Sequence, residues 1–379
     1  MAEKTIGIIA APEFPTKVAN QLEEKLPEVL NDRMDEDTSW NFETMVDGIT
    51  SVAEDNEVLL NSVLNRQANQ EWDYTLCLTD IPTFYKGDIN LARVHFEHNT
   101  AFLSLPALGW FVNKRVVKMA VQLITDIHFN HTDTSDNKQN ERLKRIFSVP
   151  KIKKVPDPEE KETVSRYILQ PKILGRLTIL LGMTYDNQPW TIMPSLKSII
   201  GIAFGSGAYG MIFPTLWELS YEYHPLRIAI LVILAILSLT LWIIQSHNLW
   251  EDKSFNGEHR YRLLYNITTL ITLIIAISLF YIILTILFFV TAFILVDPSL
   301  YANQMQMPSP PDFLNYLQLS LTTAAIGTIT GGVGVGLEDE DNIRQTTYGY
   351  RQRERYDVLK RRKEEEEEKD QDPEWNENQ

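Results

Sequence analysis

Acidic and hydroxyl side chains follow three short apolar runs near the start of the chain. Glu13, Asp47 and the adjacent pair Thr79 and Asp80 each stand within two residues of the end of a run of strand length. Ligands of open parallel sheets bind beyond the carboxyl ends of the strands, and divalent cations prefer oxygen ligands. The sequence therefore predicts a ligand site at this edge, with a divalent cation as the candidate cofactor. The alternative is that these residues only start loops and cap helices.

His95 and His98 form a second candidate metal-binding pair. Zinc proteases use HExxH on a helix, which places both imidazoles on one face with a Glu beside the metal-bound water. Here the spacing is HxxH in the segment VHFEHN, Glu97 stands at a different offset, and the context favours a strand followed by a turn. The pattern is more typical of structural histidines than of zinc ligands.

An α/β domain is expected to position these residues. Apolar runs of strand length alternate with segments of helical periodicity, which favours parallel pairing in a three-layer domain with a mostly parallel sheet. The expected strands are 5–11, 40–46, 72–78, 88–95 and 100–105, and the expected helices are 17–30, 56–70 and 113–127. The domain then covers residues 1–130. No GxGxxG motif follows the first strand, which disfavours a dinucleotide dehydrogenase.

Charge and cysteine content exclude several function classes. The formal net charge is −15, and acidic residues outnumber basic ones by more than two to one in the first hundred positions. This excess argues against nucleic acid as a partner, because a phosphate backbone attracts the opposite charge. The single cysteine, Cys77, rules out an intrachain disulfide and a CxxC site. The first residues lack the pattern of a signal peptide, so we expect the domain to remain cytosolic.

Residues 131–197 form a basic approach to a membrane. Lysine and arginine predominate over residues 138–176, which predicts contact with anionic lipids. Apolar and basic positions interleave over residues 164–183, as in an amphipathic helix that lies at the bilayer interface. The alternative is a helix packed on the α/β domain.

Residues 263–296 identify an integral membrane protein. This run contains no Asp, Glu, Lys, Arg or His. As one helix it would be about 50 Å long at 1.5 Å per residue, whereas the hydrocarbon core is about 30 Å thick. We expect one tilted helix that extends beyond the lipid. With spans at about 198–217, 228–244 and 313–335, it completes an all-α four-helix transmembrane bundle over residues 198–337.

The basic loop 245–262 and the basic residues after 337 place both termini in the cytoplasm of a multi-pass inner-membrane protein by the positive-inside rule. The charged tail, 338–379, is expected to be partly disordered. Small residues at Gly201, Gly205, Gly327 and Gly331 predict close helix packing, within the bundle or in a homo-oligomer.

Five segments together resemble a known family. They are IGIIAAPEFP, WNFETMVDGIT followed by AEDNE, WDYTLCLTDIP, FLSLPALG and YGYRQRER. The chain resembles uncharacterised bacterial membrane proteins that have a cytosolic α/β domain and four predicted spans. Some members carry the label methylenetetrahydrofolate dehydrogenase, which the residues here do not support because the dinucleotide glycine motif is missing.

These observations favour a membrane protein whose cytosolic α/β domain binds a ligand or a protein partner and whose four helices anchor it. A membrane-tethered, metal-dependent hydrolase that uses the strand-end carboxylates is one alternative. A channel or passive transporter is another. The absence of ionisable residues from the four apolar cores disfavours a coupled transporter.

Overall fold

The computed structural model divides after Asp186 into two compact units. It describes residues 2–32, 34, 38–48, 56–129, 137–157, 163–251 and 259–333, with the isolated positions 350 and 361. The expected disordered tail, 338–379, therefore falls almost entirely outside the described residues.

The first unit is built on an eight-stranded mixed sheet. Its strands are β1 (Ala2–Ala10), β2 (Thr38–Val46), β3 (Tyr74–Thr79), β4 (Phe84–Tyr85), β5 (Asp88–His95), β6 (Thr100–Ser104), β7 (Lys151–Pro156) and β8 (Val164–Gln170). Their order is β2-β1-β3-β6-β5-β8-β7, and β4 pairs with β5. The first four strands of this order are parallel, whereas every pairing that involves β4, β5, β7 or β8 is antiparallel. The prediction of a mostly parallel sheet is therefore wrong.

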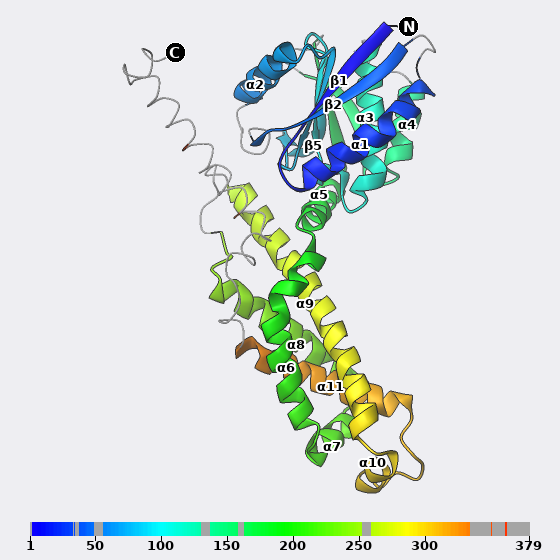
Figure 1. Ribbon diagram of the computed structural model, residues 1–379, viewed down its shortest axis with the longest axis vertical. Coiled ribbons are helices and arrows are strands. Elements are labelled where there is room, and N and C mark those ends of the chain that lie inside the picture. The colour runs from blue at the N-terminus through cyan, green and yellow to red at the C-terminus, as the bar shows by residue number, and fades with distance from the viewer. Residues whose placement is uncertain are drawn as a thin grey trace, which may run out of the picture. The chain divides into compact units, whose positions relative to one another are not determined.

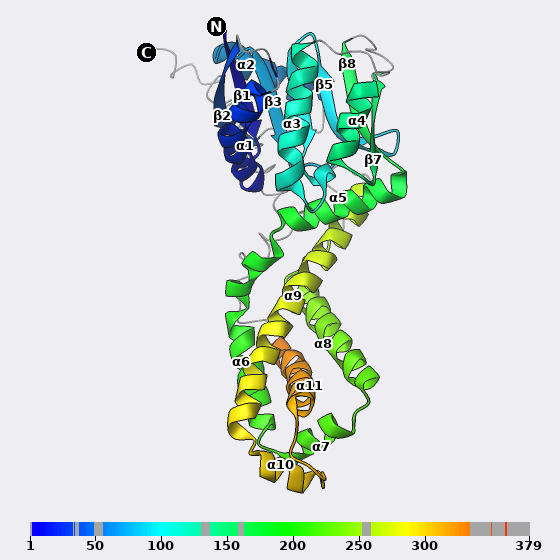
Figure 2. The ribbon, with the colours of Figure 1, turned by 90° about the vertical axis from the view of Figure 1, so that its right-hand side faces the viewer.

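Helices cover both faces of the sheet, as a three-layer domain requires. The helices α1 (Phe14–Asn31), α3 (Val112–His128) and α4 (Asn137–Ile146) lie on one face, and α2 (Asn56–Asn69) lies on the other (Figures 1 and 2). The central strand β3 is buried at all six positions, because layers cover it on both sides. Although Pro27 lies inside α1, the helix continues to Asn31.

The strands β7 and β8 were not expected. Residues 131–197 were predicted to be a linker followed by an interfacial helix, but both strands extend the sheet and the unit ends at Asp186 rather than near residue 130. The burial of β7 alternates, with Ile152 and Lys154 inside and Lys151 and Lys153 outside. This is the period of a strand, and the lysines concealed it.

The last helix of this unit, α5 (Lys172–Asp186), packs against β5, β8 and the short helix η2 (Pro106–Leu108). Two glycines on α5 permit this close approach. A Cβ atom at Gly182 would lie 2.0 Å from the Pro106 carbonyl oxygen, and one at Gly175 would lie 3.3 Å from Leu169 and Ile89. The prediction of one helix over residues 164–183 is thus wrong in its first part, because β8 occupies the first seven positions and α5 begins at Lys172.

The second unit is helical. Its elements are η3 (Pro189–Leu196), α6 (Lys197–Gly210), α7 (Pro214–Glu222), α8 (Pro225–Ser246), α9 (His259–Leu295), α10 (Pro298–Gln304) and α11 (Phe313–Gly331). Within the described chain, α8 and the Tyr261–Leu295 part of α9 are long and apolar enough to cross a membrane. The bent pair Pro189–Gly210 and Pro214–Glu222 would make a third span, with a bend of 93°. A four-span bundle is not evident from length and composition.

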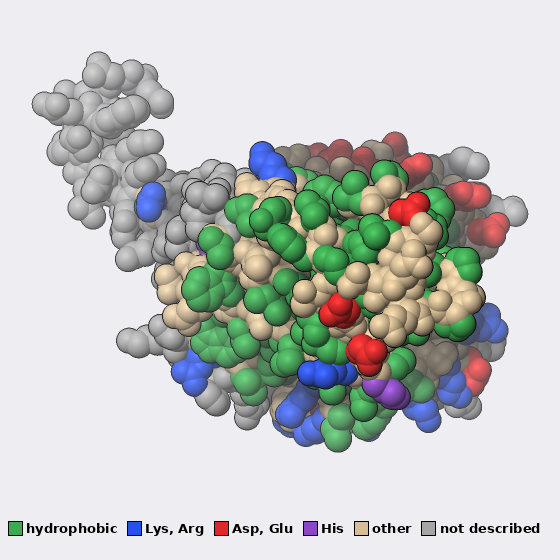
Figure 3. Space-filling model, turned by 90° about the horizontal axis from the view of Figure 1, so that it is seen from below, with side chains coloured by type: hydrophobic (Ala, Val, Ile, Leu, Met, Phe, Trp, Pro, Cys, Tyr) green, Lys and Arg blue, Asp and Glu red, His purple; other side chains and the backbone are tan. Residues whose placement is uncertain are grey.

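The helix α9 is continuous, which confirms the prediction of one long helix. By contrast, the expected span at 198–217 breaks where Pro214 begins α7. The helix α11 packs against α6, α8 and α9 (Figures 1 and 2), and buried hydroxyls such as Ser320, Thr323 and Thr328 bond to its own backbone. Hydrophobic side chains gather over the face drawn in Figure 3, with few acidic ones among them.

Candidate functional site

The predicted strand-end residues lie at one end of the sheet in different surroundings. Glu13 is exposed and adopts φ 69°, which is unusual for a residue with a side chain. Asp47 accepts hydrogen bonds from Nε and Nη2 of Arg66, both at 3.0 Å. Thr79 and Asp80 are buried, and the Thr79 hydroxyl accepts from the Ile81 N–H at 3.0 Å.

No metal-binding group results from this arrangement. In the part of the chain that the structure describes, no three His, Cys, Asp or Glu side chains come together as ligands for an ion. Glu13, Asp47 and Asp80 therefore do not form the predicted cluster. The physical reason is visible at Asp47, whose charge an arginine of α2 already neutralises.

Among the residues that the structure describes, His95 and His98 have no third metal ligand beside them. The ring centroids of His95 and His98 lie 6.5 Å apart, with His95 at the end of β5 and His98 in the following turn. His95 is buried and His98 is exposed. Burial lowers the pKa of His95 to about 3, and the charges of Arg93, His98 and Arg166 act in the same direction. His95 is therefore neutral at physiological pH.

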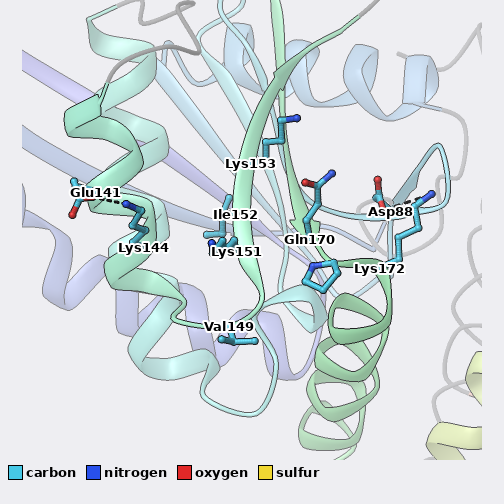
Figure 4. A pocket seen from close by; sticks show the side chains of 10 residues that line it. Asp88, Glu141, Lys144, Val149, Lys151, Ile152, Lys153, Gln170 and Lys172 are labelled. Carbon is cyan, nitrogen blue, oxygen red and sulfur yellow. Dashed lines mark hydrogen bonds and ion pairs between the residues drawn. The ribbon is translucent and has the colours of Figure 1, made fainter.

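An open groove of about 930 Å³ lies along the edge strand β7, beside α4 and the start of α5 (Figure 4). Four lysines line it together with two acidic and four other residues: Asp88, Glu141, Lys144, Val149, Lys151, Ile152, Lys153, Gln170, Pro171 and Lys172. Nζ of Lys144 pairs with Glu141 at 2.6 Å, and Nζ of Lys172 lies 3.8 Å from Asp88.

Lys151 and Lys153 give this groove its net positive charge. Both are exposed on the outer side of β7, and neither has a carboxylate within ion-pair distance among the described residues. Val149, Ile152 and Pro171 add apolar surface. A groove that combines free ammonium groups with apolar contacts suits an anionic group carried on an apolar molecule.

The exposed side of α5 is unusually apolar. Its large side chains Ile173, Leu174, Leu177 and Leu181 are exposed, with Ile173 at 76% and Leu177 at 52%. They recur at the spacing of one helical face. Lys172 and Arg176 flank this face, so α5 combines the buried packing surface described above with an outward apolar surface bordered by cations.

A buried ion pair attaches β7 and β8 to α3. Nζ of Lys154 lies 3.2 Å from Oδ2 of Asp126, both side chains are almost fully buried, and the hydroxyl of Tyr167 donates to the same carboxylate. Gln122 donates to the other carboxylate oxygen at 2.8 Å. Sequence reasoning missed this network because Lys154 was assigned to a basic linker; the apolar–polar alternation around it was the available signal.

Of the four glycines predicted to pack helices, two pack against a neighbouring helix and two face open space among the described atoms. A Cβ at Gly327 would lie 2.8 Å from the Ala203 carbonyl oxygen, and one at Gly331 would lie 3.0 Å from the Ala203 Cβ, so both pack against α6. At Gly201 and Gly205, no described atom lies within 4 Å of such a Cβ. Gly207 packs instead, since its Cβ would overlap Phe288.

No family model, curated protein or solved structure matches this chain.

Proposed function

We propose that this chain is a multi-pass membrane protein of a bacterial inner membrane whose α/β domain, on the cytoplasmic side, binds a ligand or partner while resting on anionic lipid. The observation that carries the proposal is α5, whose outward apolar face lies immediately before the helical unit. Only two residues separate the end of α5 at Asp186 from the start of η3 at Pro189.

The energetics favour lipid as the occupant of this face. Transferring a leucine side chain out of water contributes about 1.5–3 kcal/mol, and each Lys or Arg near an anionic surface adds about 1 kcal/mol. The cations of α5 and the groove lysines fall within residues 138–176, the stretch expected to contact anionic lipid. If the same apolar face were exposed to water, it would promote aggregation.

We propose that four helical segments span the membrane. By length and composition α8 and α9 each qualify as a span, and the bent pair α6–α7 is a third where it crosses as one. The fourth is α11, which contacts α6, α8 and α9. A helix at the centre of a bundle needs fewer apolar residues than one facing lipid, because its hydroxyls bond to its own backbone and its small residues permit close packing.

Gly201 and Gly205 support self-association. They form a GxxxG pair on α6 with open space at both positions. In a membrane, small residues at this spacing let two helices approach closely. We propose that this surface packs against a second copy of the chain.

Contact with lipid at α5 is tested in the full-length protein. Leu177→Cys is labelled with an environment-sensitive fluorophore in nanodiscs that contain anionic lipid; Cys77 is fully buried and burial raises its pKa, so it does not compete. We expect blue-shifted emission and quenching by doxyl lipids, both weaker in zwitterionic discs. Glu24→Cys, at an exposed position of α1, is the matched control. If position 177 behaved like position 24, α5 would not lie on the bilayer.

A further inference from the structure

One row of residues crosses the whole sheet on the face that α2 partly covers. From β2 to β7, the row is Met45, Ile9, Cys77, Phe102, Arg93, Arg166 and Val155. Its parallel half belongs to an apolar cluster with Trp72 and with side chains of α2. Its antiparallel half presents two arginines directly opposite each other. Like charges in this position destabilise a strand pair, and Asp157 offsets the charge of Arg166, so the two guanidiniums concentrate positive charge beside a single carboxylate on this face.

Arg166 is held in a fixed orientation. Its Nε and Nη2 both donate to Oδ2 of Asp157 at 2.6 Å, and its guanidinium lies 4.7 Å from the ring centroid of Tyr85. Only 13% of the side chain is exposed. Stacking on Tyr85 and pairing with Asp157 fix the orientation of the guanidinium, including its remaining N–H groups. An arginine held in this way loses little side-chain entropy when it binds an oxyanion.

His95 lies two residues beyond Arg93 on the same side of β5, and it has unused hydrogen-bonding capacity. It is 97% buried, and among the described residues its Nε2 has no hydrogen-bond partner. Oδ1 of Asn90, on the same strand, is also buried without a partner in the described part of the chain. Buried polar atoms without partners are rare, and each calls for a water or ligand that completes it.

The groups around the His95 imidazole are mainly cationic. The charges that act on its pKa are those of Arg93, His98 and Arg166, against the single carboxylate of Asp157. The ring also lies 5.8 Å from the ring of Phe102. A neutral imidazole in a positive field can donate one N–H to an incoming anion, and the anion reduces the repulsion between the two guanidiniums.

We propose that Arg93, Arg166 and Nε2 of His95 bind a small oxyanion, a phosphate or carboxylate group, on the face of β5 and β8. Asp157 takes Nε and Nη2 of Arg166, so Arg166 turns its Nη1 side to the anion. Arg93 adds a second guanidinium, whose N–H groups are donors that phosphate and carboxylate oxygens accept, and the imidazole supplies a third donor. This proposal deepens the proposed function, because it names the class of ligand that the α/β domain takes. It does not depend on the lipid contact of α5.

The test uses the full-length protein in zwitterionic nanodiscs, with inorganic phosphate and acetate as probes. We expect phosphate, acetate or both to raise the melting temperature of the wild-type protein. Arg93→Gln should weaken the titrated affinity at least tenfold, as for the loss of one charge-assisted hydrogen bond of about 1.4 kcal/mol or more. Arg93→Lys retains the charge without the fork and should recover part of the effect.

Lys25→Gln, which removes an exposed cation of α1, is the matched control and should leave the shift unchanged. A shift with phosphate alone assigns the site to phosphoryl groups, and one with acetate alone assigns it to carboxylates. No shift with either probe, or equal shifts in the wild-type protein and in Arg93→Gln, would overturn the proposal. The fluorescence of the label at position 177 reports on the lipid contact separately, so failure of one proposal is distinguishable from failure of the other.

Discussion

Replacing Gly182 with alanine should detach α5 from the α/β domain, whereas the same change at Gly175 should not. Both glycines lie inside α5 and face the domain. At Gly182 the added methyl group would meet the Pro106 carbonyl oxygen at 2.0 Å, with the Pro106 C and Cα within 3 Å. At Gly175 the nearest atoms are Cγ1 of Ile89 and Cβ of Leu169 at 3.3 Å and the Leu169 carbonyl oxygen at 3.4 Å. The contact at Gly182 is therefore a deep overlap with backbone atoms, whereas the neighbours of Gly175 need to shift by only a few tenths of an ångström.

Two opposing effects determine the net change in the free energy of unfolding. Alanine stabilises a helix interior by about 1 kcal/mol relative to glycine. Overpacking a rigid contact costs about 1–3 kcal/mol and sometimes more, and the overlap at Gly182 lies at the upper end of that range. We expect Gly182→Ala to destabilise the domain by about 2 kcal/mol. Gly175→Ala should fall between no change and a gain of about 1 kcal/mol.

Urea unfolding of the full-length protein in detergent, followed by circular dichroism, measures both values. The fluorophore at position 177 supplies a second readout, because a detached α5 should no longer hold its label at the same depth in the bilayer. Equal stability of the two alanine variants would refute the packing of α5 on η2. A stable Gly182→Ala variant with unchanged label fluorescence would do so as well.

Two further results are expected. Gly327→Leu should prevent folding of the helical unit because its side chain would collide with the Ala203 carbonyl, whereas Gly205→Leu should leave each copy folded and weaken self-association. Light scattering of the purified protein distinguishes these outcomes. Loss of folding in both variants would contradict the open space at Gly205. The second concerns His95, whose pKa is about 3 in the folded protein and about 6.5 when unfolded. The unfolded state therefore binds the extra proton between these values, so the contribution of His95 to stability is present above about pH 6.5 and is lost as the pH falls toward 3. It amounts to about 2 kcal/mol between pH 7.5 and 5. His95→Gln should flatten the pH dependence of urea unfolding by that amount, and an unchanged pH dependence would refute the burial of this imidazole.

Local periodicity was sufficient to predict most of the α/β domain. The expected strands at 88–95 and 100–105 correspond closely to β5 and β6, and the expected helix at 113–127 corresponds to α3. In each case the apolar positions recur with the period of one strand face or one helix face, so the spacing indicates the element directly. The same holds for α9, where a continuous apolar run left no other interpretation.

Features determined by distant contacts were not predictable in the same way. The alternation of β7 was hidden because Lys154 is buried only through its pairing with Asp126, a residue of α3. The direction of β5 depends on the short turn that joins it to β6, which forces an antiparallel pair. The carboxylates at the strand ends were expected to converge, but Asp47 forms an ion pair with Arg66 of α2 instead. A single sequence records none of these partners.

For the membrane-spanning arrangement proposed above, exposure along the helices indicates where the hydrocarbon lies. On α9, most of the exposed large hydrophobic side chains occur between Leu279 and Leu295, and on α8 they occur between Leu226 and Trp242. Each stretch rises about 24 Å, close to the hydrocarbon thickness of about 30 Å. The preceding part of α9 instead buries polar groups, including Asn266, which bonds to the backbone of Glu251. The excess length of α9 therefore belongs to its amino-terminal half, and we expect this half to extend beyond the lipid on the side where α8 ends.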